Sequence, residues 1–124
     1  MATSKNLNAT LTTDPDGITD QIQMLHMRVF GNRGASGIDG IVSTAFGVAA
    51  ATGAPTVCVI GDVALFHDQN GLLWSREPDA QVVFVLIDND GGGIFHLLPI
   101  AEHDPAFTKY FATPHGLDFR HVAE

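Results

Sequence analysis

Basic residues are scarce in this chain of 124 residues, which has only six Lys and Arg against fourteen Asp and Glu and a formal net charge of −8. Proteins that bind nucleic acids or anionic lipids use clustered Lys and Arg to neutralise phosphates. We therefore expect no nucleic-acid partner. Long apolar runs are missing too, because no stretch approaches the roughly 20 apolar residues that a transmembrane helix needs. We expect no membrane span.

Cysteine is nearly absent as well. The single Cys58 lies in the apolar run 56–60, so an intrachain disulfide is impossible and a buried, inert thiol is predicted. The first residues lack the apolar core of a secretory signal, and with the free thiol this favours a cytoplasmic setting. The six His form no pair at metal-ligand spacing and have no Cys cluster beside them, so a zinc site is not expected.

Apolar residues make up 45% of the chain and include eight Phe, which indicates one folded domain rather than a disordered segment. Residues 1–23 are polar and contain the turn signal Asp-Pro-Asp-Gly at 14–17, so we expect a poorly ordered leader there. The folded domain is expected to run from 24 to 124. It should be truncated at its C-terminal end, because a helix beginning after Asp118 would have scarcely two turns.

Strand and helix patterns alternate through the middle of the chain. We predict strands at 24–30, 57–60 and 82–87, the last two buried on both faces, and helices at about 36–52 and 66–76. Ser36 and Asp39 resemble a capping box at the start of the first helix, and Gly53 should end it. This alternation predicts an α/β fold with a parallel sheet flanked by helices on both faces, a three-layer α/β/α arrangement that is incomplete in this chain.

Polar side chains and glycines follow two of the predicted strands. Asp62 comes after the strand at 57–60, and Asn89 with the glycines at 91–93 comes after the strand at 82–87. Parallel strands end at one edge of a sheet, where ligands of such folds bind. Carboxylate, amide and carbonyl oxygens suit Mg²⁺, and a glycine-rich turn lets backbone N–H groups approach a phosphate. The simpler alternative is that Asp62 caps a helix and the glycines form a tight turn.

The spacing of these residues resembles the motif of thiamin diphosphate (ThDP) enzymes, which begins with Gly-Asp and ends with Asn. Here Gly61-Asp62 is followed by 26 residues and then Asn89. The resemblance implies that Asp62, Asn89 and the backbone carbonyl of Gly91 bind Mg²⁺, with Mn²⁺ as a substitute, and that the ion anchors the cofactor diphosphate. Val63 departs from the glycine that many members of the family have at that position.

Three further blocks resemble the carboligases of menaquinone biosynthesis within the ThDP family: residues 32–40, residues 89–99, and residues 110–115. This resemblance implies contacts to the cofactor and to the substrates 2-oxoglutarate and isochorismate. The implied cofactor-binding residues are Ser36, Gly37, Ile38, Gly61, Asp62, Val63, Ala64, Asn89, Gly91, Gly92, Gly93 and Ile94. The implied substrate-binding residues are Arg33, Phe95 and Leu98. The alternatives are a solvated turn for Arg33 and ordinary core for Phe95 and Leu98.

The resemblance implies a ThDP-dependent transferase that decarboxylates 2-oxoglutarate and adds the succinyl unit to isochorismate. No catalytic residue is expected in this chain, because the activating glutamate of such enzymes belongs to a pyrimidine-binding domain of the same or another subunit. We therefore expect a homodimeric or homotetrameric parent and an isolated chain without activity. The alternatives are another ThDP carboligase, similar to acetohydroxyacid synthase, and a non-catalytic α/β module that binds a different nucleotide.

Overall fold

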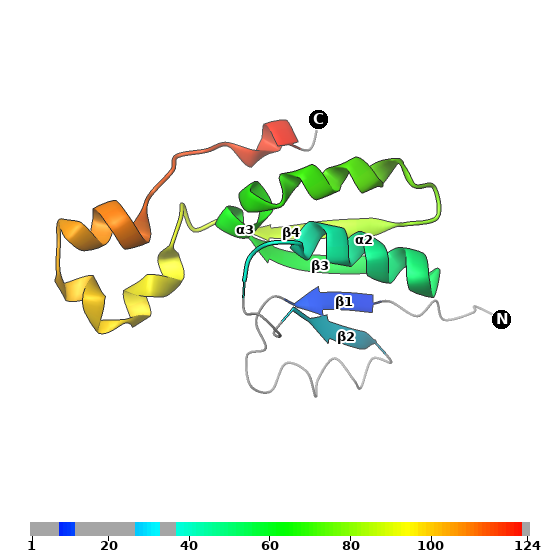
Figure 1. Cartoon of the computed structure of the whole chain (residues 1–124), viewed down its shortest axis with the longest axis horizontal. Coiled ribbons are helices and arrows are strands. Elements are labelled where there is room, and N and C mark those ends of the chain that lie inside the picture. Colours follow the sequence, from blue (N-terminus) through cyan, green and yellow to red (C-terminus); the bar gives the residue numbers. More distant parts are fainter. Residues whose placement is uncertain (1–7, 12–26, 33–36, 123–124) are drawn as a thin grey trace.

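A parallel β-sheet organises the chain (Figure 1). The computed structural model describes residues 8–11, 27–32 and 37–122. The sheet within these residues has four strands in the order β2-β1-β3-β4, and every neighbouring pair is parallel. The strands are β1 (Asn8–Leu11), β2 (Arg28–Gly31), β3 (Thr56–Gly61) and β4 (Val82–Ile87). The predicted α/β class with a parallel sheet is confirmed, and all the strands end at one edge.

Strand β1 lies inside the segment that we expected to be a leader. It pairs with β2 on one side and β3 on the other, so it is an inner strand of the sheet. The expectation of no regular structure is wrong for these four residues. Their sequence, Asn-Ala-Thr-Leu, has no apolar run, and only the pairing with two neighbours makes it a strand. The other leader residues lie outside the described part of the chain, as do residues 24–26 of the strand predicted at 24–30.

Helix α2 (Ile41–Thr52) follows β2 and packs on the sheet against β1, β3 and β4. It begins later than predicted. The residue before it is Gly40, in the left-handed region at φ 72°, and no side chain caps this end, so the predicted start near residue 36 is wrong. Ser36, the first residue of the predicted capping box, lies outside the described residues. The predicted end is confirmed, because Gly53 adopts φ 63° and its N–H bonds to the carbonyl of Ala49.

The connection from β3 to β4 is a broken helix rather than the single helix predicted at 66–76. It consists of α3 (Asp62–His67) and the 3₁₀ helix η1 (Gln69–Arg76). The break falls at Asp68, whose carboxylate accepts a hydrogen bond from the backbone N–H of Ser43, 3.1 Å away. Gly71 lies so close to α2 that a Cβ there would stand 2.9 Å from the Val42 side chain. Contact with α2 therefore fixes where the helix breaks.

Only one face of the sheet is covered in the part of the chain that the structure describes. Cys58 and Ile60 of β3 are fully buried beneath α2, with Phe84 of β4 packed against them. On the other face, Val83 is 62% exposed and Ile87 is 54% exposed. The prediction of burial on two faces is therefore wrong for β4, whereas Val57 and Val59 of β3 are partly buried on this face. The third layer of the expected sandwich is not seen in the described residues.

The chain after β4 runs beyond the carboxyl edge of the sheet and then returns (Figure 1). Three short helices lie out there, η2 (Gly93–Leu97), η3 (Pro99–Glu102) and the π-helix η4 (Thr108–Ala112). The returning 3₁₀ helix η5 (Phe119–Val122) buries Phe119 in the core. Asp118 accepts a hydrogen bond from the Arg120 backbone N–H and so caps this helix, which begins after Asp118 as expected.

No helix in the described ranges has the length and apolar character required to cross a membrane.

Replacing Ile60 by Ala should lower the free energy of unfolding by about 2–5 kcal/mol, because the side chain is fully buried and its removal leaves a cavity. Val83→Ala on the open face of the neighbouring strand should cost less than about 1 kcal/mol. Urea denaturation followed by circular dichroism measures both. Equal losses would contradict a sheet that is packed on one face.

Candidate functional site

The Asp62 carboxylate is the buried charge at the carboxyl edge of the sheet. Asp62 directly follows β3 and is 2% exposed. Its Oδ1 accepts a hydrogen bond from the Val63 N–H at 2.8 Å, and its Oδ2 accepts from the N–H groups of Gly91 at 2.8 Å and Asn89 at 3.3 Å. A buried charge is tolerated when hydrogen bonds replace its hydration. The backbone N–H groups of the loop after β4 thus take the place of water around this carboxylate.

These surroundings act on the acidity of Asp62 in opposite directions. Burial raises the pKa of its carboxyl, whereas hydrogen bonds from the backbone of Gly91 and Val63, and then from His115, lower it, and the net shift is downward. The carboxyl is therefore ionised at neutral pH. The site carries a fixed negative charge, as a cation-binding site requires.

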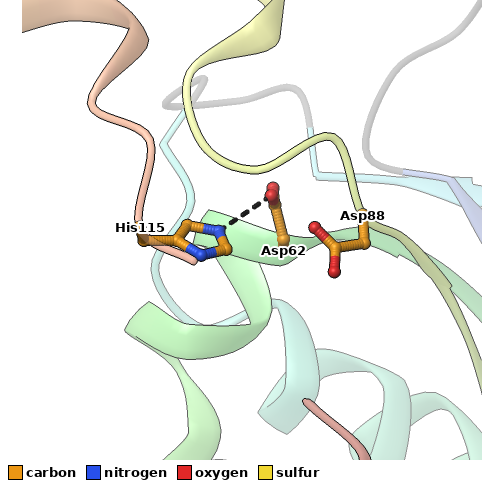
Figure 2. A group of neighbouring side chains, drawn as sticks. All are labelled: Asp62, Asp88 and His115. Carbon is orange, nitrogen blue, oxygen red and sulfur yellow. Dashed lines mark hydrogen bonds and ion pairs between the residues drawn. The ribbon is translucent and has the colours of Figure 1, made fainter. Parts of the chain in front are cut away.

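Two further side chains lie beside Asp62, as Figure 2 shows, with His115 on one side and Asp88 on the other. His115 Nε2 is 3.0 Å from Asp62 Oδ2. One possible ligand atom from each of Asp62, Asp88 and His115 falls within 4.8 Å of the others. We did not predict a role for either neighbour. The block at 110–115 drew attention to His115, but no spacing pattern links it to a residue 53 positions earlier.

The glycines after β4 are required by a close approach of the backbone. Gly91 adopts φ 122°, and a Cβ on it would collide with the carbonyl oxygen of Ala112. A Cβ on Gly92 would collide with the carbonyl oxygen of Phe111. The N–H of Gly91 binds Asp62, and that of Gly92 binds the Ala112 carbonyl at 2.7 Å. These two N–H groups are thus already engaged within the chain, although we expected them to face a phosphate.

A cavity of about 520 Å³ opens at the same edge of the sheet and collects most of the predicted site residues. Predicted residues on its wall are Gly37, Ile38, Gly61, Asp62, Val63, Ala64, Asn89, Gly91, Gly92, Ile94 and Phe95. Residues on its wall that we did not predict are Asn32, Ile41, Val59, Ile60, Ile87, Phe111 and Thr113. The wall therefore combines residues at or after the ends of β2, β3 and β4 with Phe111 of η4 and Thr113 just after it.

Two predicted residues in the described part of the chain are not on this wall. Gly93 lies against the side chain of Asn89, and Leu98 is 49% exposed at the end of η2. Arg33 and Ser36 lie outside the described residues. Asp62 and Asn89, the two side chains on which the predicted metal site depends, do share the cavity.

Replacing Asp62 by Asn should lower the free energy of unfolding most at neutral pH. Because folding lowers the pKa of this carboxyl, its stabilising effect is complete above the usual aspartate pKa of about 3.9 and is lost as the pH falls through the folded value. Urea unfolding of both proteins from neutral to acidic pH should show a difference that shrinks in acid. A difference that does not change with pH would contradict an ionised, hydrogen-bonded Asp62.

Comparison with known proteins finds close relatives for most of the chain. Three relatives are each named 2-succinyl-5-enolpyruvyl-6-hydroxy-3-cyclohexene-1-carboxylate synthase. That of Roseiflexus castenholzii is 54% identical over 100 residues, which cover 80% of this chain and 17% of the relative. The protein of Halobacterium salinarum is 55% identical over 98 residues, with 79% and 17% covered. That of Haloarcula marismortui is 58% identical over 93 residues, with 75% and 16% covered.

No protein-family model matches the chain. The matched region spans only about 17% of the length of the first relatives. Identity above one half over most of this chain is nevertheless far beyond what a shared fold alone would give. Over the matched residues, the chain therefore belongs to the family of the 2-succinyl-5-enolpyruvyl-6-hydroxy-3-cyclohexene-1-carboxylate synthases.

Proposed function

We propose that this chain forms the part of a ThDP-dependent carboligase that holds the divalent metal ion and the cofactor diphosphate. The observation that carries the proposal is the shared cavity of Asp62 and Asn89 at the carboxyl edge of a parallel sheet. The relatives named above support a carboligase that makes a succinylated cyclohexene carboxylate, a step of menaquinone biosynthesis.

The residues present fit a magnesium ion. Mg²⁺ prefers oxygen ligands and takes one or two protein groups together with substrate phosphates. Asp62 offers an ionised carboxylate, Asn89 an amide oxygen, and Gly91 a backbone carbonyl. Mn²⁺ has similar ligand preferences and would bind to the same set. The three proposed ligands are all hard oxygen donors, which these ions prefer, whereas zinc favours sulfur and nitrogen donors.

The rest of the cavity wall suits an organic cofactor and its substrate. Ile38, Val63, Ile94 and Phe95 supply apolar surface next to the charged Asp62. We assign Ile38 and the residues after β3 to the cofactor and Phe95 to the substrate side. Arg33, whose planar guanidinium would bind a carboxylate in a bidentate manner, is assigned to 2-oxoglutarate or isochorismate. Leu98 is outside this cavity wall, so its role as a pocket residue stays a prediction.

ThDP, when bound, supplies the carbanion chemistry that decarboxylates a 2-oxo acid and transfers the remaining acyl unit. The residues of this chain position the cofactor and compensate its negative charge through a metal ion. We assign the glutamate that activates the aminopyrimidine to a pyrimidine-binding domain of the same or another subunit in a dimeric or tetrameric parent. This chain alone should bind the cofactor weakly and catalyse nothing.

Asp62→Ala should abolish Mg²⁺-dependent binding of ThDP, because it removes the ionised ligand. Isothermal titration of the chain with ThDP, with and without Mg²⁺, measures this. Asp79→Ala is the matched control, since Asp79 is exposed and lies in the turn before β4, away from the carboxyl edge, and it should bind like the unchanged chain.

One further variant and a second ligand make that experiment decisive. Asn89→Ala removes an exposed side chain and should weaken binding while circular dichroism shows a folded protein. ATP with Mg²⁺ should bind more weakly than ThDP. Preference for ATP, or ThDP binding that survives Asp62→Ala, would instead favour a nucleotide-binding module and overturn the proposed function.

The purified chain should form no carboligation product from 2-oxoglutarate and isochorismate, because we assign the glutamate that activates the cofactor to another domain. Mass spectrometry of the reaction mixture with ThDP and Mg²⁺ tests this. Product from pyruvate but not from 2-oxoglutarate would point to a carboligase similar to acetohydroxyacid synthase. Product from 2-oxoglutarate and isochorismate would show that this chain is catalytically sufficient.

A further inference from the structure

The geometry points to His115 as a positioning residue of the proposed metal site, one that donates a hydrogen bond to the Asp62 carboxylate without binding the ion itself. The inference rests on the proposed function and adds a residue that neither motif spacing nor the comparisons assign. His115 comes from the tail segment, defined here as residues 112–117, more than fifty positions after Asp62.

The hydrogen bonds of the imidazole determine which of its nitrogens carries the proton. The backbone N–H of Leu117 donates to His115 Nδ1 at 3.0 Å, so Nδ1 must have a free lone pair. The proton of the neutral ring is then on Nε2, which lies 3.0 Å from Asp62 Oδ2. Asp90 Oδ1 is also 3.4 Å from Nδ1, but it already accepts two backbone N–H groups, and Leu117 is closer.

This tautomer makes His115 a donor and not a metal ligand. A ligating Nε2 would have to give up its proton to Nδ1, which would leave the Leu117 N–H without its acceptor. As a donor, His115 completes a set of three hydrogen bonds to Asp62 Oδ2, together with the N–H groups of Asn89 and Gly91. Val63 is the backbone donor to Oδ1 among the described residues, which leaves this oxygen a lone pair for a cation, and Asp88 is the second carboxyl group beside Asp62.

Hydrogen bonds hold the tail segment at the carboxyl edge of the sheet, and this fixes the position of His115 relative to Asp62. Asp90 Oδ1 accepts the N–H groups of His115 at 3.1 Å and Gly116 at 2.7 Å, and the Gly92 N–H binds the Ala112 carbonyl. The His115 ring also stacks edge to face on Phe119, which is buried in the core. The imidazole therefore approaches Asp62 from a fixed direction.

Residues that donate a hydrogen bond to a metal ligand, without binding the metal themselves, usually contribute tenfold or more to metal affinity. His115→Leu keeps the bulk of the side chain and removes the donor, so it should weaken Mn²⁺ binding by about 10-fold. His115→Gln carries an N–H at the distance of Nε2 and should restore most of the affinity. His103→Leu is the control, because His103 is exposed at the end of η3, and it should bind Mn²⁺ like the unchanged chain.

Electron paramagnetic resonance of free Mn²⁺ measures these affinities in the presence of ThDP. If the unchanged chain binds no Mn²⁺, the proposed function fails. If it binds and His115→Leu binds equally well, the role of His115 is overturned while the proposed function stands. Equal weakening in His115→Leu and His115→Gln would indicate packing or direct ligation in place of a donated hydrogen bond.

A spectroscopic measurement tests the tautomer without any metal. Long-range ¹H–¹⁵N correlation spectra, recorded at a pH where the ring is neutral, should show the His115 proton on Nε2 and none on Nδ1, and Asp62→Asn should alter the Nε2 signal more than the signals of the other histidines. A ring protonated on Nδ1 in the metal-free chain would overturn the inference.

Discussion

The hydrogen-bonded carboxylate of Asp62 is the interaction around which the carboxyl edge of this sheet is arranged. A charge buried to this degree must be solvated by the protein itself. Three separate stretches of chain do so, through the N–H groups of Val63 and Gly91 and the imidazole of His115. The end of β3, the loop after β4 and the tail segment are therefore fixed relative to one another by a single side chain.

The tail segment gives the glycines after β4 a second explanation. Gly91 and Gly92 have no side chain because the carbonyls of residues 111–113 occupy the space that a Cβ would need. The backbone of residues 111–113 can then form a wall of the cavity, to which Phe111 and Thr113 contribute. The glycine-rich turn thus shapes the cavity by admitting another part of the chain. This is independent of any contact that its N–H groups could make with a phosphate.

Short sequence patterns were enough to predict strands β3 and β4 and the end of helix α2. Strands β3 and β4 are unbroken apolar runs, and Gly53 is a helix terminator, so the parallel α/β class and the meeting of Asp62 with Asn89 could be derived from spacing. Burial on one face could not be derived, because a run of Val and Ile looks the same whether one face or both are covered. Strand β1 lacked an apolar pattern, and the contact of His115 depends on a fold that brings distant residues together.

The open face of β4 has a consequence for how the stability of the chain changes with temperature. Unfolding raises the heat capacity in proportion to the apolar surface that newly enters water. Val83, Val85 and Ile87 are already 41–62% exposed in the folded chain and so add less to this change than buried side chains of the same type would. The stability curve of the isolated chain is therefore flatter, with a broader maximum, than its 45% apolar content alone would give.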